Sequence, residues 1–278
     1  MGMLEEIRVH RLVERLLADR ADGTAYDGAW DKSLTPQTMV EAYRVQDSII
    51  RRMRSRGTEP GGWRIALTTD AAQKQHDIVH PIVGPIWRQD VLSSPSTLPE
   101  SERHSPEAGA ELALRIGKPM GADDGPWDRE SVAGCVGAVA LAIGIFDDRH
   151  VSGLAEYTIG LGIADLAGSA ACVLGQEIDD LKVLDCDSLE FRTALDEREV
   201  GVASTSAYLA HPYEILSWVA THLNVRRRQL EPGDVVLLGC PGEPFPLGSG
   251  DQITVTNDAL GTVTLALEGQ PTAAQASS

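Results

Sequence analysis

The stretch GAELALRIG, residues 109–117, decides the fold because its side chains alternate as they do in a β-strand. Successive residues of a strand point to opposite faces, so one face carries the aliphatic side chains of Leu112, Leu114 and Ile116. The other face carries Glu111, with the bare Gly109 two residues before it. The pattern predicts a half-buried strand, and it raises the question of whether one carboxylate on that second face can hold a metal ion.

The composition is typical of a globular protein with an acidic surface. The chain has 278 residues, 42% of them hydrophobic and 23% charged, which is enough for one large domain or two modest ones with a real core. Asp and Glu number 41 against 24 Lys and Arg, for a net charge of −17. Nucleic acid and anionic membranes bind basic surfaces, so we expect neither as a partner. The expected partner is a small-molecule substrate, and an anionic one would need a local cationic pocket.

The cysteines and the N-terminal segment predict a cytoplasmic protein. The four cysteines are scattered without paired ligand spacing, which favours reduced, buried thiols over a zinc site or disulfides. The segment MGMLEEIRVHRLVERLL, residues 1–17, is charged and amphipathic and predicts a helix rather than a signal peptide. No apolar run approaches the length that crosses a bilayer.

Residues 1–60 have helical periodicity. After the first helix, Thr35 and Pro36 predict an N-cap and a first helical residue, and that second helix is expected to end near Gly57. We expect this region to pack on the remainder of the chain rather than fold alone. A later helix is predicted to start at Pro212, with the arginines 226–228 near its end on a solvated face.

Residues 61–268 are dominated by strand patterns. Short apolar runs read as strands, namely WRIALTT, ELALRI, AVALAIGIF and the fully buried VVLLG, and a hairpin-like connection joins DQITVT to TVTLALE. Segments 94–106 and 117–130 are predicted loops, and residues 269–278 a disordered tail. Together these elements predict an α+β protein with a mixed, strongly bent sheet.

Several stretches taken together carry a resemblance. They are AYRVQ (42–46), GGWRIALTT (61–69), AELALRIG (110–117), AIGIFDDR (142–149), IADLAGSAACVLG (163–175), AYLAHPYEILSWVATHL (207–223), LEPGDVVLLG (230–239) and LGTVTLALE (260–268). In this order they resemble the 2-keto-4-pentenoate hydratase and 4-oxalocrotonate decarboxylase branch of the fumarylacetoacetate hydrolase superfamily. The resemblance implies that family's fold, a bent mixed sheet or β-roll with a small N-terminal helical layer, and a homo-oligomer.

The metal chemistry of the family does not carry over. Members bind magnesium through an E-x-E strand and a third glutamate on a neighbouring strand, and these positions match Gly109, Glu111 and Gly144 here. Magnesium normally needs several oxygen ligands in octahedral geometry, so one carboxylate is too few. Glu107 is a substitute only if a bulge shortens the roughly 13 Å that separate it from Glu111 along an ideal strand. We therefore expect no metal cofactor, with magnesium as the alternative.

Other family positions differ as well. The family lysine is Arg64, which cannot accept a proton at neutral pH. The acid of a PDYG-like segment falls on Ile82, and the amide of an ADNASS-like segment falls on Leu166.

Arg64 and Glu111 are the predicted catalytic residues. Arg64 is suited to clamp a carboxylate or enolate, and a buried Glu111 with a raised pKa is suited to acid–base catalysis. The alternative is a structural ion pair with an acid such as Glu111, which is compatible with a role in the pocket.

Asp165, Ser169, His80 and Trp87 are the predicted substrate-binding residues. Asp165 and Ser169 would serve equally well as helix caps, and His80 as part of a surface or lid pair with His76.

These observations leave three functions open. The first is a metal-independent lyase or cyclase that acts on an enol, dienone or polyketide-like molecule by dehydration, Michael-type ring closure, cycloaddition or rearrangement. Such reactions are accelerated by orientation and preorganised hydrogen bonds. The second is a noncatalytic partner subunit, and the third a magnesium-dependent hydratase or decarboxylase.

Overall fold

The computed structural model describes residues 3–22, 31–99, 104–147, 149, 158–181 and 184–269. The helices are α1 (Met3–Ala21), α2 (Met39–Ser55), α3 (Asp70–Gln75), α4 (Arg129–Ala133), α5 (Ile159–Ala164) and α6 (Pro212–Val225). Short 3₁₀ helices are η1 (Lys32–Leu34), η2 (Arg88–Asp90), η4 (Ala122–Asp124), η5 (Leu166–Gly168) and η7 (Thr205–Ala207). None of the helices in these ranges is long and apolar enough to cross a membrane.

The strands form two sheets. They are β1 (Pro60–Ala66), β2 (Ile82–Trp87), β3 (Val91–Ser93), β4 (Ser96–Pro99), β5 (Pro106–Ile116), β6 (Val136–Asp147), β7 (Ser169–Ile178), β8 (Glu190–Leu195), β9 (Arg198–Ser204), β10 (Val235–Leu237), β11 (Phe245–Pro246), β12 (Gln252–Asn257) and β13 (Gly261–Glu268). The larger sheet has the order β2-β1-β10-β5-β6-β7-β3, with β11 on β5, and the smaller has the order β4-β13-β12-β8-β9. Parallel pairs such as β1–β10 stand beside antiparallel pairs such as β5–β6, so the larger sheet is mixed, as predicted.

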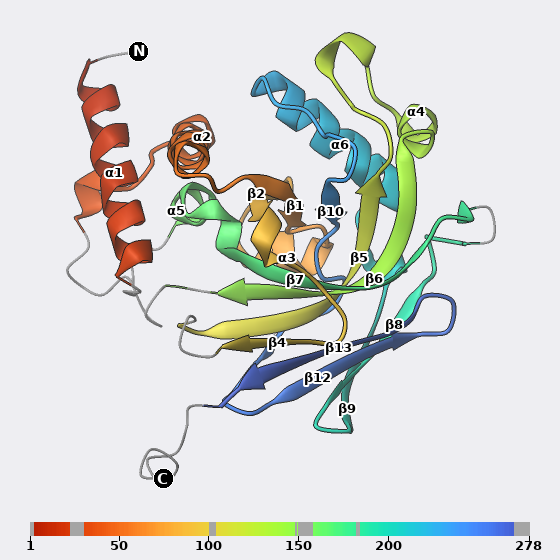
Figure 1. The fold of residues 1–278 in the computed structure, drawn as a ribbon. Coiled ribbons are helices and arrows are strands. Elements are labelled where there is room, and N and C mark those ends of the chain that lie inside the picture. Colours follow the sequence, from red (N-terminus) through yellow and green to blue (C-terminus); the bar gives the residue numbers. More distant parts are fainter. Residues whose placement is uncertain are drawn as a thin grey trace, which may run out of the picture.

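The larger sheet curls, and the other layers cover it (Figure 1). Figure 1 shows β5 and β6 bending along their length, with the smaller sheet below them and α1, α2 and α6 at the opposite side. Side chains from α1, both sheets and α6 share one buried hydrophobic cluster. The N-terminal helices therefore pack on the sheet, as expected for a layer that would not fold alone.

The strand that decided the fold is buried on both faces. Leu112 and Leu114 are fully buried on one face, as the alternation predicts. On the other face, Glu111 is also fully buried, and Ala113 joins a second small core with Ala140 and neighbouring side chains. The prediction of a half-buried strand is wrong because the curl of the sheet, which alternation does not reveal, covers its concave face.

Two boundaries differ from their predictions. Helix α2 is capped by Thr38, whose side chain accepts a hydrogen bond from the Glu41 amide, while Thr35 ends the preceding η1 turn. The predicted loop 94–106 contains β4, which pairs in parallel with β13. A four-residue edge strand carries too little pattern to recognise without its partner. The predicted tail lies outside the described residues from position 270 on.

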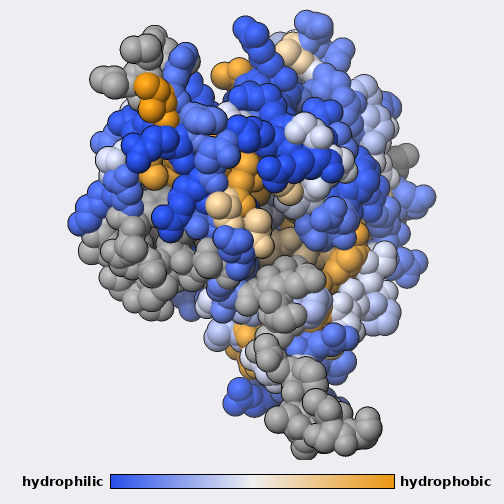
Figure 2. All heavy atoms as spheres, turned by 60° about the vertical axis from the view of Figure 1, so that its left-hand side comes forward, coloured by the Kyte–Doolittle hydropathy of each residue, from blue (hydrophilic) through white to orange (hydrophobic). Residues whose placement is uncertain are grey.

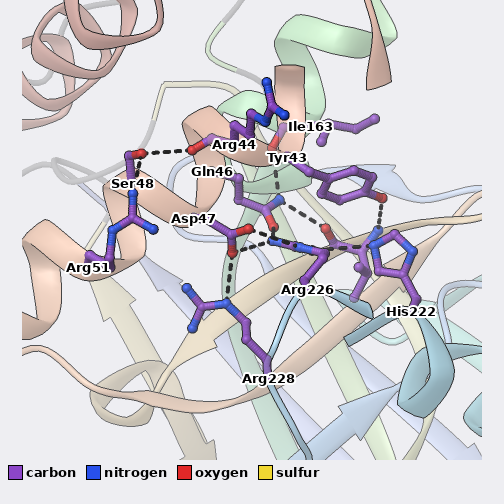
Figure 3. Close-up of polar contacts among 11 residues, drawn as sticks. Tyr43, Arg44, Gln46, Asp47, Ser48, Arg51, Ile163, His222, Arg226 and Arg228 are labelled. Carbon is purple, nitrogen blue, oxygen red and sulfur yellow. Dashed lines mark hydrogen bonds and ion pairs between the residues drawn. The ribbon is translucent and has the colours of Figure 1, made fainter. Parts of the chain in front are cut away.

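A buried glutamine joins the helical layer to the sheet (Figure 3). The Gln46 amide nitrogen, on α2, donates to the carbonyl oxygens of Val83 in β2 and Ile163 in α5, both at 2.9 Å. Its oxygen accepts a hydrogen bond of 2.7 Å from Arg226, just after α6. One fully buried side chain thus fixes four elements relative to one another.

The arginines after α6 are not solvated as a group, which corrects the prediction for residues 226–228. Arg226 and Arg228 both bind the Asp47 carboxylate, at 2.8 and 2.7 Å, and the Arg226 side chain is only 8% exposed. Burial, and then the Arg226 charge, lower the pKa of the nearby His222 to about 4. The run of arginines in the sequence does not reveal this ion pair between helices, because Asp47 lies 179 residues before Arg226.

Hydrophilic residues cover most of one face of the molecule (Figure 2). The face in Figure 2 is dominated by hydrophilic residues, with hydrophobic ones in small separate patches. Among the described residues, the exposed large hydrophobic ones are Ile7, Val40, Val79, Val202, Leu209 and Val225, of which Val40 and Val225 line one groove.

Candidate functional site

Arg64 and Glu111 form a buried ion pair at the centre of the larger sheet. Arg64 comes from β1 and Glu111 from β5, with β10 between them. The Nη2 atom of Arg64 binds the Oε1 atom of Glu111 directly, and the two side chains are 1% and 0% exposed. The ion pair that was the alternative expectation for Arg64 is therefore present.

The remaining contacts of the pair come from the backbone and one aromatic ring. Arg64 Nη1 donates to the carbonyl oxygen of Ile145 at 2.8 Å, and the amide of Gly239 donates to Glu111 Oε2 at 3.0 Å. The guanidinium carbon of Arg64 lies 3.2 Å from the centroid of the Phe146 ring, a close cation–π contact. The pair is thus enclosed by β6 and by the segment after β10.

Two glycines lie beside this pair. Gly109 and Gly144 are directly opposite each other on β5 and β6, so positions 109, 111 and 144 converge at one place, as the resemblance implies. A Cβ at Gly144 would lie 2.1 Å from Glu111 Oε1 and 2.2 Å from Arg64 Nη2. A Cβ at Gly109 would lie 2.8 Å from the sulfur of Cys240. Any larger side chain at either position would displace a neighbour.

Burial dominates the electrostatics here. Desolvation raises the pKa of Glu111, while the Arg64 charge and the Gly239 amide oppose the rise. Burial also raises the pKa of Cys240 to about 12, with the Glu111 charge adding to the rise. The Cys240 thiol is therefore protonated at neutral pH and is a poor nucleophile.

A cavity lies next to the pair but does not include it. This inner cavity has a volume of about 290 Å³ and lies between β1, β2, β6, α5 and the segment after β10. Phe146, Gly239 and Cys240 line it and also pack around the pair, whereas Arg64 and Glu111 are absent from its wall. These three residues separate the ion pair from the inner cavity.

The polar groups that do line the inner cavity come from several elements. Its wall includes Glu107, Asp147, Arg149, Asp165 and His76 among apolar side chains. Arg149 is 6% exposed and supplies a buried positive charge. The Asp147 carboxylate accepts hydrogen bonds from two loop amides, those of His104 and Ser105. The cavity therefore offers carboxylates and a guanidinium group to a small ligand.

The structure brings only one of the four predicted substrate-binding residues to this cavity. Asp165 lines it, and its carboxylate is held by Arg20 of α1 at 2.6 Å. Ser169 is buried at the start of β7, and its hydroxyl makes no hydrogen bond among the described residues. His80 lines a separate groove of about 550 Å³ between α2 and α6, and Trp87 is buried at the end of β2.

Sequence reasoning missed Phe146 and Arg149 as cavity residues. The signal for Phe146 was its place two residues after Gly144 on the same strand, where it has the same side-chain direction. Glu107 could replace a missing metal ligand only if a bulge brought it close to Glu111. The β5–β6 ladder is regular from Pro106 to Arg115, so Glu107 faces the inner cavity instead of joining Glu111.

The donor set at this place does not fit a divalent metal. Positions 109 and 144 have no side chain, Glu111 is bound to a guanidinium group, and no cluster of three or more His, Cys, Asp or Glu that could hold a metal occurs in the part of the chain that the structure describes. Hard divalent cations need several oxygen ligands, and a positive charge already occupies the space.

The chain belongs to the fumarylacetoacetate (FAA) hydrolase family. Residues 62–267 match the model of the FAA hydrolase C-terminal domain, which confirms the resemblance and the fold class. Within the family, its relatives are hydratases and decarboxylases. The TodF product hydratase of Pseudomonas putida is 28% identical over 84% of this chain and 87% of that protein. The 2-keto-4-pentenoate hydratase 1 of Dechloromonas aromatica is 27% identical over 89% and 92%.

Solved structures share the fold. The 4-oxalocrotonate decarboxylase from Pseudomonas putida G7, complexed with magnesium and adipate, has a TM-score of 0.87 and 22% identity over 96% of this chain and 99% of that one. The fumarylpyruvate hydrolase from Pseudomonas aeruginosa, in complex with Mn²⁺ and pyruvate, has a TM-score of 0.62 and 16% identity over 75% and 89%. These neighbours bind divalent cations.

Proposed function

We propose that the protein is a lyase-type enzyme that converts a small enolisable carbonyl compound of the 2-oxo-acid class in the inner cavity, without a divalent metal. The relatives are hydratases and decarboxylases, which act on substrates of this kind. The observation that carries the proposal is an apolar cavity whose wall combines the buried Arg149 guanidinium with the Glu107 and Asp165 carboxylates. Apolar walls with a few convergent polar groups are typical of small-molecule sites.

The residues of the cavity have distinct expected roles. Arg149 would bind the carboxylate or enolate oxygen of the substrate, since a guanidinium matches such groups with two parallel hydrogen bonds. Glu107 would transfer the proton between carbon and oxygen, and the Phe146 ring would orient the carbon chain. Water addition, water elimination and ring closure all need such a proton transfer next to a stabilised enolate.

Arg64 and Glu111 then act through other residues. Both are buried behind Phe146, so the pair positions that ring and the Gly239 amide rather than contacting substrate. We assign them a positioning role in place of the catalytic one expected from the sequence.

A turnover assay tests the proposal. Purified protein is stripped with EDTA and given 2-keto-4-pentenoate and 4-oxalocrotonate, with loss of the conjugated substrate followed by ultraviolet absorbance. We expect turnover in EDTA, a large loss in Glu107→Gln and no loss in Glu130→Gln, a matched change at an exposed position. Full activity of Glu107→Gln would contradict its role.

The same assay separates the alternatives. The fold shared with a magnesium-bound decarboxylase favours a magnesium-dependent hydratase or decarboxylase as the second candidate. Turnover that needs added magnesium would establish that second candidate. No turnover of any 2-oxo acid, together with stable association with a related subunit, would favour a noncatalytic partner.

A further inference from the structure

The space between β1, β5 and β6 holds a positive charge that is part of the chain. We propose that the guanidinium group of Arg64 is the permanent cation of this place, and that the place is closed to divalent metals. The inference depends on the proposed function in one respect, which is that the reaction takes place next to this ion pair. Its test uses metal binding and stability rather than turnover.

The contacts around Arg64 suit a large, delocalised cation. They comprise one carboxylate (Glu111), one carbonyl oxygen (Ile145) and the face of one aromatic ring (Phe146). A planar guanidinium binds carboxylates and stacks on rings, whereas a hard divalent ion needs about six oxygen ligands. The single negative charge of Glu111 also balances one positive charge and not two.

The glycines provide the room for this cation. With Arg64 in place, position 144 cannot carry even a Cβ without overlapping the pair. Position 109 is likewise limited by Cys240, at 2.8 Å from a Cβ built there. A ligand-bearing side chain at 144 and the guanidinium group exclude each other, and one at 109 would displace Cys240. The missing ligands and the arginine therefore form one consistent arrangement.

The pair is also sealed. Arg64 and Glu111 are 1% and 0% exposed, and Phe146 and Cys240 lie between them and the inner cavity. An entering metal ion would have to expel the guanidinium group from its carboxylate. Within the described residues Arg64 Nε has no hydrogen-bond partner, so the surroundings satisfy only the two terminal nitrogens.

Metal titration of the wild-type protein gives the first test. Protein stripped with EDTA is titrated with Mn²⁺, followed by water proton relaxation, and its melting midpoint is compared in EDTA and in about 1 mM MgCl₂. We expect no saturable Mn²⁺ binding and no shift of the midpoint. Stoichiometric binding that Glu111→Gln abolishes would overturn the inference.

Chemical rescue gives the second test. Arg64→Ala removes the cation and leaves the surrounding groups, so about 10 mM methylguanidinium should raise the melting midpoint of this variant and not that of the wild type. Methylammonium is the control of equal charge without the planar group. No rise with methylguanidinium, or a rise with MgCl₂ instead, would contradict a guanidinium site.

The two tests remain informative if the variant does not fold or if the protein is inactive. If Arg64→Ala does not fold, the wild-type titration alone decides the inference. An inactive protein that excludes metal and is rescued by methylguanidinium would refute the proposed function and leave this inference standing.

Discussion

Replacing Arg64 by methionine should destabilise the protein strongly at neutral pH. The variant keeps most of the apolar volume but leaves Glu111 buried with only the Gly239 amide as a hydrogen-bond donor. Removing one partner of a buried ion pair costs about 3–5 kcal/mol of unfolding free energy. For a chain of this size, that loss lowers the melting midpoint by roughly 6–20 °C.

The pH dependence of this loss has a defined sign. Burial already raises the pKa of Glu111 above its ordinary value of 4.5, and removal of the Arg64 charge should raise it further. The folded variant then binds a proton more tightly than the unfolded chain does. Its stability is retained below the unfolded pKa and falls as the pH rises through the folded pKa. The deficit relative to wild type should be small near pH 5 and largest near pH 8.

A double variant isolates the charge from the packing. Arg64→Met with Glu111→Leu replaces the pair by apolar side chains, a change that is often neutral or stabilising. We expect urea unfolding, followed by circular dichroism at pH 5 and pH 8, to show the double variant close to wild type at both values. A single variant that loses less than about 1 kcal/mol at pH 8, within the range of an exposed pair, would refute the reasoning.

Three further predictions concern packing and titration. Gly144→Ala should cost about 1–3 kcal/mol by overpacking against the Arg64 pair, whereas Gly134→Ala, whose Cβ would meet nothing closer than 3.6 Å, should cost little in the same urea titration. Gln46→Met should lose about 1–3 kcal/mol of unfolding free energy, because it removes the amide donor of two buried carbonyl oxygens and one of the hydrogen bonds of Arg226; a melting midpoint equal to wild type would contradict this. His222, with its pKa lowered to about 4, should stay neutral in an NMR titration from pH 8 to 5, and its depressed pKa should make stability fall as the pH drops from about 6.5 to about 4; a midpoint near pH 6.5 in the NMR titration would count against it.

Much of the fold could be predicted from local pattern. The aliphatic face of β5, the buried β10 and the hairpin of β12 and β13 each depend on alternation or on continuous apolar runs, and all three are present. The burial of the Glu111 face could not be predicted, because it depends on how far the whole sheet curls. Short elements such as β4 also depend on a distant partner strand.

The sequence predicted which positions form the candidate site, but not how deeply these positions are buried. The convergence of Gly109, Glu111 and Gly144 could be expected from the resemblance and from the two-residue period of strands. The sequence could not predict that Phe146 separates the ion pair from the inner cavity, because this depends on the rotamer that places its ring over Arg64. The separation of His80 from the inner cavity could not be predicted either, because His80 lines the groove between α2 and α6 while Ile82, two residues later, lines the inner cavity.

The ion pair of Arg20 with Asp165 indicates that the N-terminal helix is needed to form the inner cavity. The family match starts at residue 62, yet the wall of the inner cavity is held by an arginine 42 positions earlier, at the end of α1. A chain trimmed to the matched segment would keep nearly all of the strand residues and still present a loosened, more anionic wall to its substrate. For this protein, the matched domain and the part of the chain needed for a competent enzyme are expected to have different boundaries.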